Sequence, residues 1–182
     1  MAQILIFLLL FISLNANDIF KVKSFHELHY KNVIQQTYEE SCGASSLATL
    51  MNLYDANLSE KDLLSDLNST NVVNFFDLQK TAQKNGFRAK GYNITKKIFK
   101  QLSFPVIARV LRHSNYPHFI VVYNLQGDFV LVLDPNNGKR LMSKSEFYNI
   151  WNKEDNGYIL VVLPKTNKRL NISYLLPKYL QK

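Results

Sequence analysis

Residues 118–134 read HFIVVYNLQGDFVLVLD, and this segment decides the fold class of the chain. Two runs within it, 118–125 and 129–134, are rich in valine, isoleucine and aromatic residues, which is typical of β-strands. The residues between them, Gln126 to Asp128, are few enough to close an antiparallel hairpin. Residues whose numbers sum to about 254 then face each other. His118 is therefore expected nearly opposite Asp134, at the open end of the hairpin.

Two more strands and four helices are predicted around this hairpin. Runs of similar composition at 104–111 and 158–163 predict strands. Residues 41–54, SCGASSLATLMNLY, space their apolar side chains as an amphipathic helix does, and Ser41 is the expected N-cap.

Further helices are expected at 59–67, at 74–85 before the C-cap Gly86, and at 143–151 after the cap Ser143. Residues 33–36 are expected to be extended as they approach the first long helix. Helices that precede an antiparallel sheet predict an α+β domain.

The composition indicates one globular domain with one cysteine. With 182 residues, 47% of them hydrophobic and 20% charged, the chain can build one core and is not disordered. Because Cys42 is the only cysteine, the chain can form neither an internal disulfide nor a zinc or iron–sulfur site with several thiolates. Cys42 is therefore a buried thiol, a partner in an intermolecular bridge, or a nucleophile.

The charge is basic but dispersed. Twenty-two lysines and arginines oppose 14 acids, which gives a net charge of +8 without an arginine-rich run. This pattern favours a solvated basic surface over a nucleic-acid or membrane-surface binder. The tail 164–182 has no acidic residue, and its apolar side chains between Ile172 and Leu180 are expected to dock on the domain rather than on a membrane.

Residues 1–17, MAQILIFLLLFISLNAN, are predicted to be a separate unit. They carry no charge, and their apolar run at 4–14 is shorter than the ~20 residues that a membrane-spanning helix needs. The run suits a secretory signal peptide cleaved near Ala16. An uncleaved N-terminal anchor is the alternative, because no lysine or arginine precedes the run. We therefore predict an exported protein, periplasmic or extracellular, with a domain at 18–163 and a basic tail at 164–182.

Cys42 stands at the start of the first long predicted helix. Unpaired N–H groups and the helix dipole stabilise an anion there, which favours the reactive thiolate. His118 is the candidate base, because Asp134, held extended by Pro135, can accept a hydrogen bond from its imidazole. This is the arrangement of a papain-like nucleophile and base. His113 is a competing base, but it falls in a predicted loop without a carboxylate at a comparable offset.

An oxyanion donor is expected shortly before Cys42. Gln36 lies six residues upstream, where its amide can share an oxyanion hole with the backbone N–H of Cys42. The adjacent Gln35 could serve equally on spacing alone. His26 and His29 lack the spacing and the carboxylates of a metal site, so no metal or cofactor is expected.

Three segments together resemble a known family: VIQQTYEESCGASSLATLMNLY, FPVIARV, and HFIVVYNLQGDFVLVLDPNNGKRLMSKSEFYNIW. They are similar to the bacteriocin-processing cysteine peptidases, papain-like domains that cut leader peptides after a double glycine. The resemblance covers about residues 34–163. It rests on the order Gln, Cys-Gly, His, Asp-Pro, Gly-Lys-Arg and a final helix with Phe and Trp.

The resemblance implies a papain-like peptidase with N-terminal helices packed on a C-terminal antiparallel sheet. Cys42 would be the nucleophile, His118 the general base and then acid, and Asp134 the orienting carboxylate. Gln36, at the papain-like offset, would be the oxyanion donor in preference to Gln35.

In this family the peptidase domain is commonly fused to a membrane transporter with an ATPase; none follows in these residues, so a stand-alone domain is expected. The expected partners are a peptide substrate, with a double-glycine leader, and an export or transporter apparatus. The alternative is a non-enzymatic peptide-binding accessory module of an export or surface-assembly system.

Overall fold

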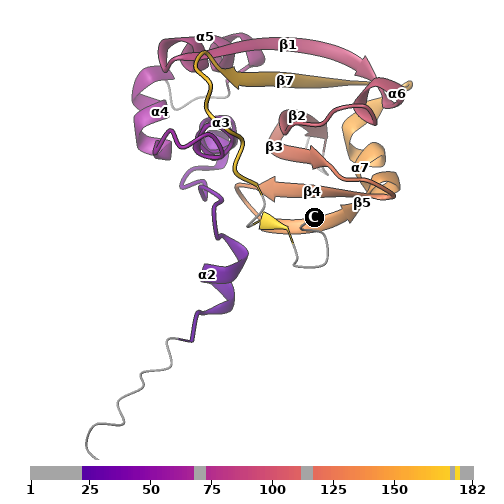
Figure 1. The fold of residues 1–182 in the computed structure, drawn as a ribbon, viewed down its shortest axis with the longest axis horizontal. Coiled ribbons are helices and arrows are strands. Elements are labelled where there is room, and N and C mark those ends of the chain that lie inside the picture. Colours follow the sequence, from indigo (N-terminus) through magenta and orange to yellow (C-terminus); the bar gives the residue numbers. More distant parts are fainter. Residues whose placement is uncertain (1–21, 68–72, 112–116, 173–174, 177–182) are drawn as a thin grey trace, which may run out of the picture.

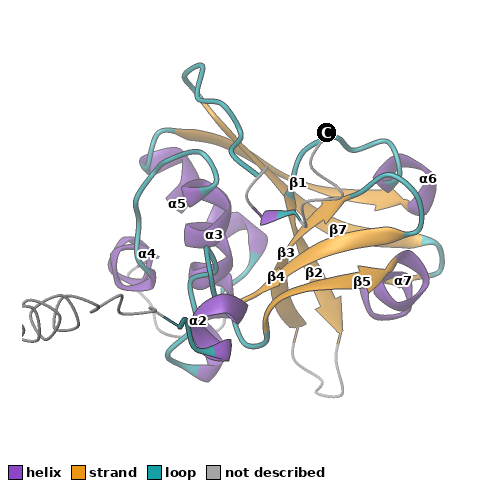
Figure 2. Cartoon of the chain, turned by 60° about the horizontal axis from the view of Figure 1, so that its bottom comes forward, coloured by secondary structure: helices purple, strands orange, loops and turns teal. Residues whose placement is uncertain are grey.

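The computed structural model describes residues 22–67, 73–111, 117–172 and 175–176 (Figure 1). In this part of the chain, an antiparallel sheet lies between two groups of helices. Helices α3, α4 and α5 pack on one face, and α6 and α7 pack on the other (Figures 1 and 2). The predicted α+β class is confirmed. The predicted signal segment 1–17 and the candidate base His113 lie outside the described residues.

The N-terminal part of the described chain is helical, and the C-terminal part contains the strands with two short helices between them. The helices are α2 (Phe25–His29), the 3-10 turn η1 (Glu39–Ser41), α3 (Cys42–Asn52), α4 (Glu60–Leu67), α5 (Phe75–Lys84), α6 (Lys96–Phe99) and α7 (Lys144–Trp151). The strands are β1 (Phe87–Thr95), β2 (Val106–Leu111), β3 (Pro117–Asn124), β4 (Phe129–Asp134), β5 (Gly138–Ser143), β6 (Asn152–Lys153) and β7 (Asn156–Pro164). They form one sheet in the order β1-β7-β2-β3-β4-β5, and β6 pairs with β7.

Local capping sets the helix starts. At α5, the side chain of Asn74 accepts hydrogen bonds from the N–H groups of Phe76 and Asp77, and Asp77 reaches back to the N–H of Asn74. The same reciprocal arrangement joins Ser59 and Asp62 at the start of α4. These capping boxes satisfy N–H groups that have no partner inside the helix, so helices of modest length are fixed at their N-termini.

The four predicted helices and four predicted strands form close to their expected positions. The register of the hairpin is also as predicted. Val121 pairs with Leu133 and Val122 with Val132 in the β3–β4 ladder, as the turn length predicts. Residues 33–36 were expected to be extended before α3, but they join no strand of the sheet.

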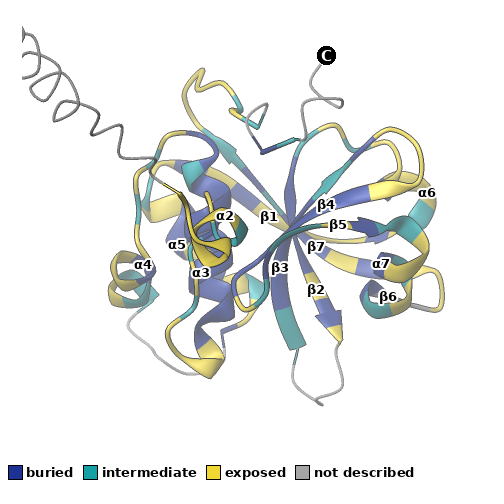
Figure 3. Cartoon of the chain, turned by 90° about the horizontal axis from the view of Figure 1, so that it is seen from below, coloured by how far each residue is buried: buried dark blue, intermediate teal, exposed yellow. Residues whose placement is uncertain are grey.

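The two outermost strands, β1 and β5, were not predicted. Each is an edge of the sheet and pairs with one neighbour only. An edge strand has one neighbour fewer, so it needs fewer apolar residues. Strand β1 is exposed at most positions (Figure 3). Strand β5 has the sequence GKRLMS, with only two large apolar residues. Polar residues on an edge also discourage pairing with another chain. The apolar signal that revealed the inner strands is therefore weak in both.

Helix α3 is the centre of the fold. Its residues from Cys42 to Met51 are all buried, because the helix is covered by α4 and α5 and packs against β3. On the opposite face of the sheet, the rings of Phe99, Phe147 and Trp151 pack together with centroids 5.0–5.2 Å apart. The sheet is thus rigidly held from both sides, which fixes the position of any group at the ends of its inner strands.

The described part of the tail packs on the domain. Leu175 is 2% exposed within the core on the α3 side, and Ile172 packs against the same core. The backbone N–H of Asn171 donates to the carbonyl of Leu53, at 2.9 Å. These residues follow the expected docking on the domain, whereas Tyr179 and Leu180 lie outside the described residues. None of the described helices has the length and apolar character to span a bilayer.

Gly138 offers a test of how tightly the β4–β5 turn is packed. Its φ is +69°, and an added Cβ would lie 2.7 Å from the carbonyl oxygen of His29. Gly127 has a similar φ of +78° but open space around it. We expect Gly138→Ala to destabilise the fold by ~1–3 kcal/mol more than Gly127→Ala, because only the former adds overpacking to backbone strain. Urea unfolding of both variants measures this, and equal midpoints would contradict the described packing.

Candidate active site

Cys42 is the first residue of α3 and is 6% exposed. A Cβ at the next residue, Gly43, would come within 2.5 Å of the side chain of Val73, so the glycine makes room for the residues before α5, and it would touch Phe119 of β3 at 3.4 Å. Ser46 also donates its hydroxyl to the carbonyl of Phe119, at 2.9 Å. Because Phe119 follows His118, these contacts hold α3, which begins with Cys42, beside the candidate base.

Ser41 occupies the N-cap position but does not cap α3 as expected. Its side chain makes no capping hydrogen bond to the helix. Instead, the hydroxyl donates to the carbonyl of Tyr38, at 2.8 Å, and accepts from the N–H of Tyr38, at 3.1 Å. The cause is the 3-10 turn η1, which brings the side chain of Ser41 back onto the preceding loop. This turn was not predicted from the sequence.

His118 and Asp134 meet at the open end of the hairpin, as predicted. The imidazole Nε2 lies 2.9 Å from Oδ1 of Asp134, and the two side chains are 15% and 0% exposed. A buried carboxylate needs compensation, and Asp134 receives it from the turn that follows. It accepts the N–H of Asn136 at 2.9 Å, the N–H of Asn137 at 3.3 Å and the side-chain amide of Asn137 at 3.0 Å.

The same imidazole also interacts with the sulfur of Cys42. Burial lowers the pKa of His118, but hydrogen bonds and charge interactions with Asp134 and Cys42 outweigh burial and raise this pKa to about 9. Since Nε2 is taken by Asp134, Nδ1 is left to face the sulfur. At neutral pH the imidazole is therefore protonated and can act as a proton donor.

Gln36 joins the site through its backbone as well as its side chain. Its N–H donates to the carbonyl of Pro135, at 3.1 Å, which ties the loop before Cys42 to the residue after Asp134. Its side-chain amide donates to the carbonyls of Tyr38 and Glu39, at 2.9 and 3.1 Å. Gln35 is exposed, whereas Gln36 is half-buried. Of the two glutamines that spacing left open, Gln36 is the one with this contact to the Asp134 turn.

Two residues that support Asp134 and its turn were not predicted from the sequence. Asn137 supports the carboxylate directly, and Tyr30 donates its hydroxyl to the carbonyl of Asn136 in the same turn, at 2.6 Å. An Asp-Pro-Asn-Asn-Gly stretch signals a turn, but only the observed turn geometry aims its N–H groups at Asp134. The contact of Tyr30 could not be predicted from a local pattern, because Tyr30 and Asn136 are far apart in the sequence.

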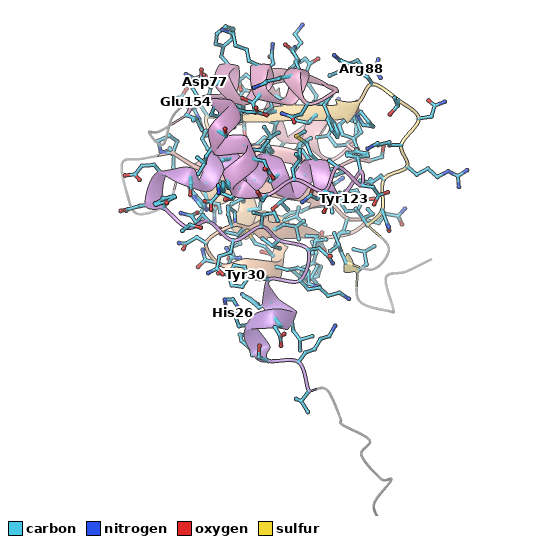
Figure 4. All side chains as sticks on the ribbon, turned by 90° about the vertical axis from the view of Figure 1, so that its left-hand side faces the viewer. His26, Tyr30, Asp77, Arg88, Tyr123 and Glu154 are labelled. Atoms are coloured by element: carbon cyan, nitrogen blue, oxygen red, sulfur yellow. The ribbon has the colours of Figure 1, made fainter. Side chains whose placement is uncertain are left out.

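The other two histidines that the structure describes, His26 and His29, take no part in this arrangement. The ring of His26 packs at a tilt against that of Tyr30, with ring centroids 4.7 Å apart, and both residues lie where the N-terminal segment meets the domain (Figure 4). His29 packs against Gly138. Among the described residues, no group of His, Cys, Asp or Glu could hold a metal ion. Cys42, His118 and Asp134 therefore lie together although they come from two halves of the chain, and Gln36 is linked to them through Pro135.

Comparisons with known proteins identify the family of the chain. The model of the Peptidase C39 family matches residues 30–167. The chain is 30% identical over 141 residues to the probable functional amyloid protease FapD of Pseudomonas aeruginosa, covering 72% of this chain and 62% of that protein. It is also 30% identical over 148 residues to the lactococcin-G-processing and transport ATP-binding protein LagD of Lactococcus lactis subsp. lactis, covering 78% of this chain and 20% of LagD. The chain thus spans less than two thirds of the length of either relative.

A solved structure shares the fold. The crystal structure of a double glycine motif protease from an AMS/PCAT transporter, in complex with the leader peptide, superposes with a TM-score of 0.64 and 27% identity. The superposition covers 73% of this chain and 91% of that one. The predicted resemblance and the papain-like α+β fold are confirmed. The chain belongs to the Peptidase C39 family.

Proposed function

We propose that this protein is a cysteine endopeptidase that cuts a peptide or leader after small residues such as Gly-Gly. The observation that carries the proposal is one imidazole, His118, that interacts with both the Cys42 sulfur and the buried Asp134. A buried carboxylate that orients an imidazole next to a thiol is the apparatus of nucleophilic acyl transfer.

The proposed reaction has two stages. The thiolate of Cys42 attacks the peptide carbonyl, the C–N bond breaks, and the imidazolium of His118 gives its proton to the leaving amine. Water then attacks the thioester and loses a proton to His118, and the acid leaves as the sulfur is released. Asp134 holds the ring in the orientation that both proton transfers need.

The proposed oxyanion donors are the backbone N–H of Cys42 and the amide of Gln36. The amide now donates to Tyr38 and Glu39, so our proposal includes a turn of one N–H from these carbonyls toward the substrate. Such a donor contributes because it meets the charge that develops only in the transition state.

The double-glycine preference is supported by the relatives. The solved neighbour is a double glycine motif protease with its leader peptide, and LagD is named for processing lactococcin G. FapD is named as a probable functional amyloid protease. The partners that we propose are therefore a peptide or protein substrate and an export or transport apparatus.

A leader-like peptide with a Gly-Gly site tests the specificity. We expect the full chain to cut after the second glycine, and to lose at least ~10-fold in kcat/KM when either glycine becomes valine, because a site shaped for glycine rejects a larger side chain. Mass spectrometry of the products locates the cut. Equal cleavage of the Gly-Gly and valine peptides would reject the preference while leaving a cysteine peptidase.

We also propose that the protein acts outside the cytosol, in the periplasm or beyond the cell. The support is the uncharged apolar segment 1–17, read as a signal peptide or an anchor, before the domain at 18–163 and the basic tail at 164–182. N-terminal sequencing of the natural protein tests this, since a cytosolic form that begins at Met1 would contradict export. An anchored form would bring the domain to a membrane surface.

A further inference from the structure

Glu60 is a buried carboxylate that the reaction above does not use. Among the described residues, only two acids are buried: Asp134, in the active site, and Glu60, which is 8% exposed. A buried charge destabilises a protein unless hydrogen bonds compensate for its lost hydration. The partners of Glu60 therefore indicate what this carboxylate holds.

Those partners belong to the loop that leads to Cys42. Oε1 accepts the backbone N–H of Thr37 at 2.8 Å, and Oε2 accepts the hydroxyl of Thr37 at 2.6 Å. The hydroxyl of Ser41, at the other end of this segment, donates instead to the carbonyl of Tyr38, next to Thr37. Thr37 directly follows Gln36, and Ser41 directly precedes Cys42. Glu60 thus holds the start of the segment between the proposed oxyanion amide and Cys42, and Ser41 ties the end of that segment back to its start through Tyr38.

Glu60 itself is held by the body of the protein. It is the first residue of α4, whose start is fixed by the Ser59–Asp62 capping box and whose Leu63 is fully buried in the core. The positive end of the helix favours a negative charge in this first turn. Movement of the loop relative to α4 would therefore break its hydrogen bonds to Glu60, because α4 is held in place by the core.

The carboxylate is ionised at neutral pH. Burial alone would raise the pKa of Glu60, but favourable interactions with the polar groups of Ser41 and Thr37 outweigh burial and lower this pKa below its ordinary value of 4.5. Hydrogen bonds to an ionised acceptor are stronger than those to a neutral one. Its bonds to the loop therefore persist throughout the neutral range.

We propose that Glu60 is a positioning residue that fixes residues 37–41 and thereby holds Gln36 and the N–H of Cys42 in register as an oxyanion hole. The inference rests on the proposed function of these two groups. Preorganisation of this kind matters because a displacement of ~1 Å at a catalytic group can cost ~100-fold in rate. Glu60 touches neither the substrate nor the His118–Asp134 pair in this account, so its loss should impair the hole and spare the thiol.

The test compares Glu60→Ala and Glu60→Gln in the full chain on the Gly-Gly peptide. We expect Glu60→Ala to lower kcat by ~10- to 100-fold with KM within ~2-fold of wild type. Glu60→Gln should lose less, because its amide still offers one acceptor. Alkylation of Cys42 by iodoacetamide, which needs no oxyanion hole, should stay near the wild-type rate in both. Glu40→Gln, an exposed acid of the same loop, is the charge-matched control and should behave as wild type.

Several outcomes would overturn the inference. A wild-type kcat in Glu60→Ala would do so, and so would equal losses of kcat, alkylation rate and folded fraction, which indicate a purely structural role. If Glu60→Ala does not fold, Glu60→Gln and Thr37→Val are combined. We expect the fold-loss in kcat of the double variant to be smaller than the product of the two single fold-losses, because both substitutions weaken the same contact. A fold-loss equal to that product would overturn the proposal. Cleavage by Cys42→Ala would instead reject the proposed function itself, so the two failures are distinguishable.

Discussion

Cys42→Ala is expected to abolish peptide cleavage and to leave the fold in place. Without the sulfur no acyl-enzyme forms, and His118 and Asp134 have no nucleophile to activate, so we expect kcat to fall by at least ~10⁴-fold. The change removes one buried atom from the start of α3 and adds none. A stability loss of only ~1 kcal/mol is therefore expected. Product mass spectra and a urea unfolding curve check both halves of this prediction.

The same variant separates the two functions that the sequence left open. A non-enzymatic accessory module would bind a leader-like peptide but cut it in neither form. A peptidase cuts it in the wild-type form alone, and the inactive variant should still bind the peptide. Unchanged turnover in Cys42→Ala would mean that the nucleophile lies elsewhere.

Asp134→Asn is expected to have the second-largest effect, with partial activity retained. The amide can still accept a hydrogen bond from His118, but it no longer supplies the negative charge that favours the imidazolium. The pKa of His118, about 9 in the native protein, should therefore fall. Because the proposed active form carries the proton, wild-type activity should decline as pH rises through about 9. The variant should begin this decline at lower pH and lose ~10- to 100-fold in kcat/KM near neutrality.

The measurement is a pH profile of kcat/KM for wild type and variant. Asp128→Asn is the matched control, because Asp128 is an exposed carboxylate at the other end of the same hairpin. Its alkaline limb should coincide with that of wild type. An Asp134→Asn profile with an unshifted alkaline limb would contradict the role given to this carboxylate.

The sequence was informative where burial was complete. The inner strands β2, β3, β4 and β7 are runs of branched and aromatic residues, and the three-residue turn of the hairpin sets the register that brings His118 to Asp134. Edge strands β1 and β5 bury too little surface to leave such a pattern. The capping boxes of α4 and α5 are local, so helix starts could be read closely.

The site was predictable in its residue types but not in its support. Cys42, His118, Asp134 and Gln36 could be proposed from position, spacing and resemblance. The contacts that hold them join residues distant in the sequence, as in Glu60 to Thr37, Tyr30 to Asn136 and Gln36 to Pro135. Such pairs depend on how separate segments dock against one another, which no single segment encodes. The 3-10 turn at Glu39–Ser41 was missed for the same reason, since its place between Glu60 and α3 is a tertiary constraint.

The most direct test of the central claim is one comparison by mass spectrometry. Wild type and Cys42→Ala are each incubated with the same Gly-Gly leader-like peptide, and the products are weighed. The account predicts a single cut after the second glycine by the wild-type protein and an intact peptide with the variant. Cleavage at the same bond by Cys42→Ala would contradict it.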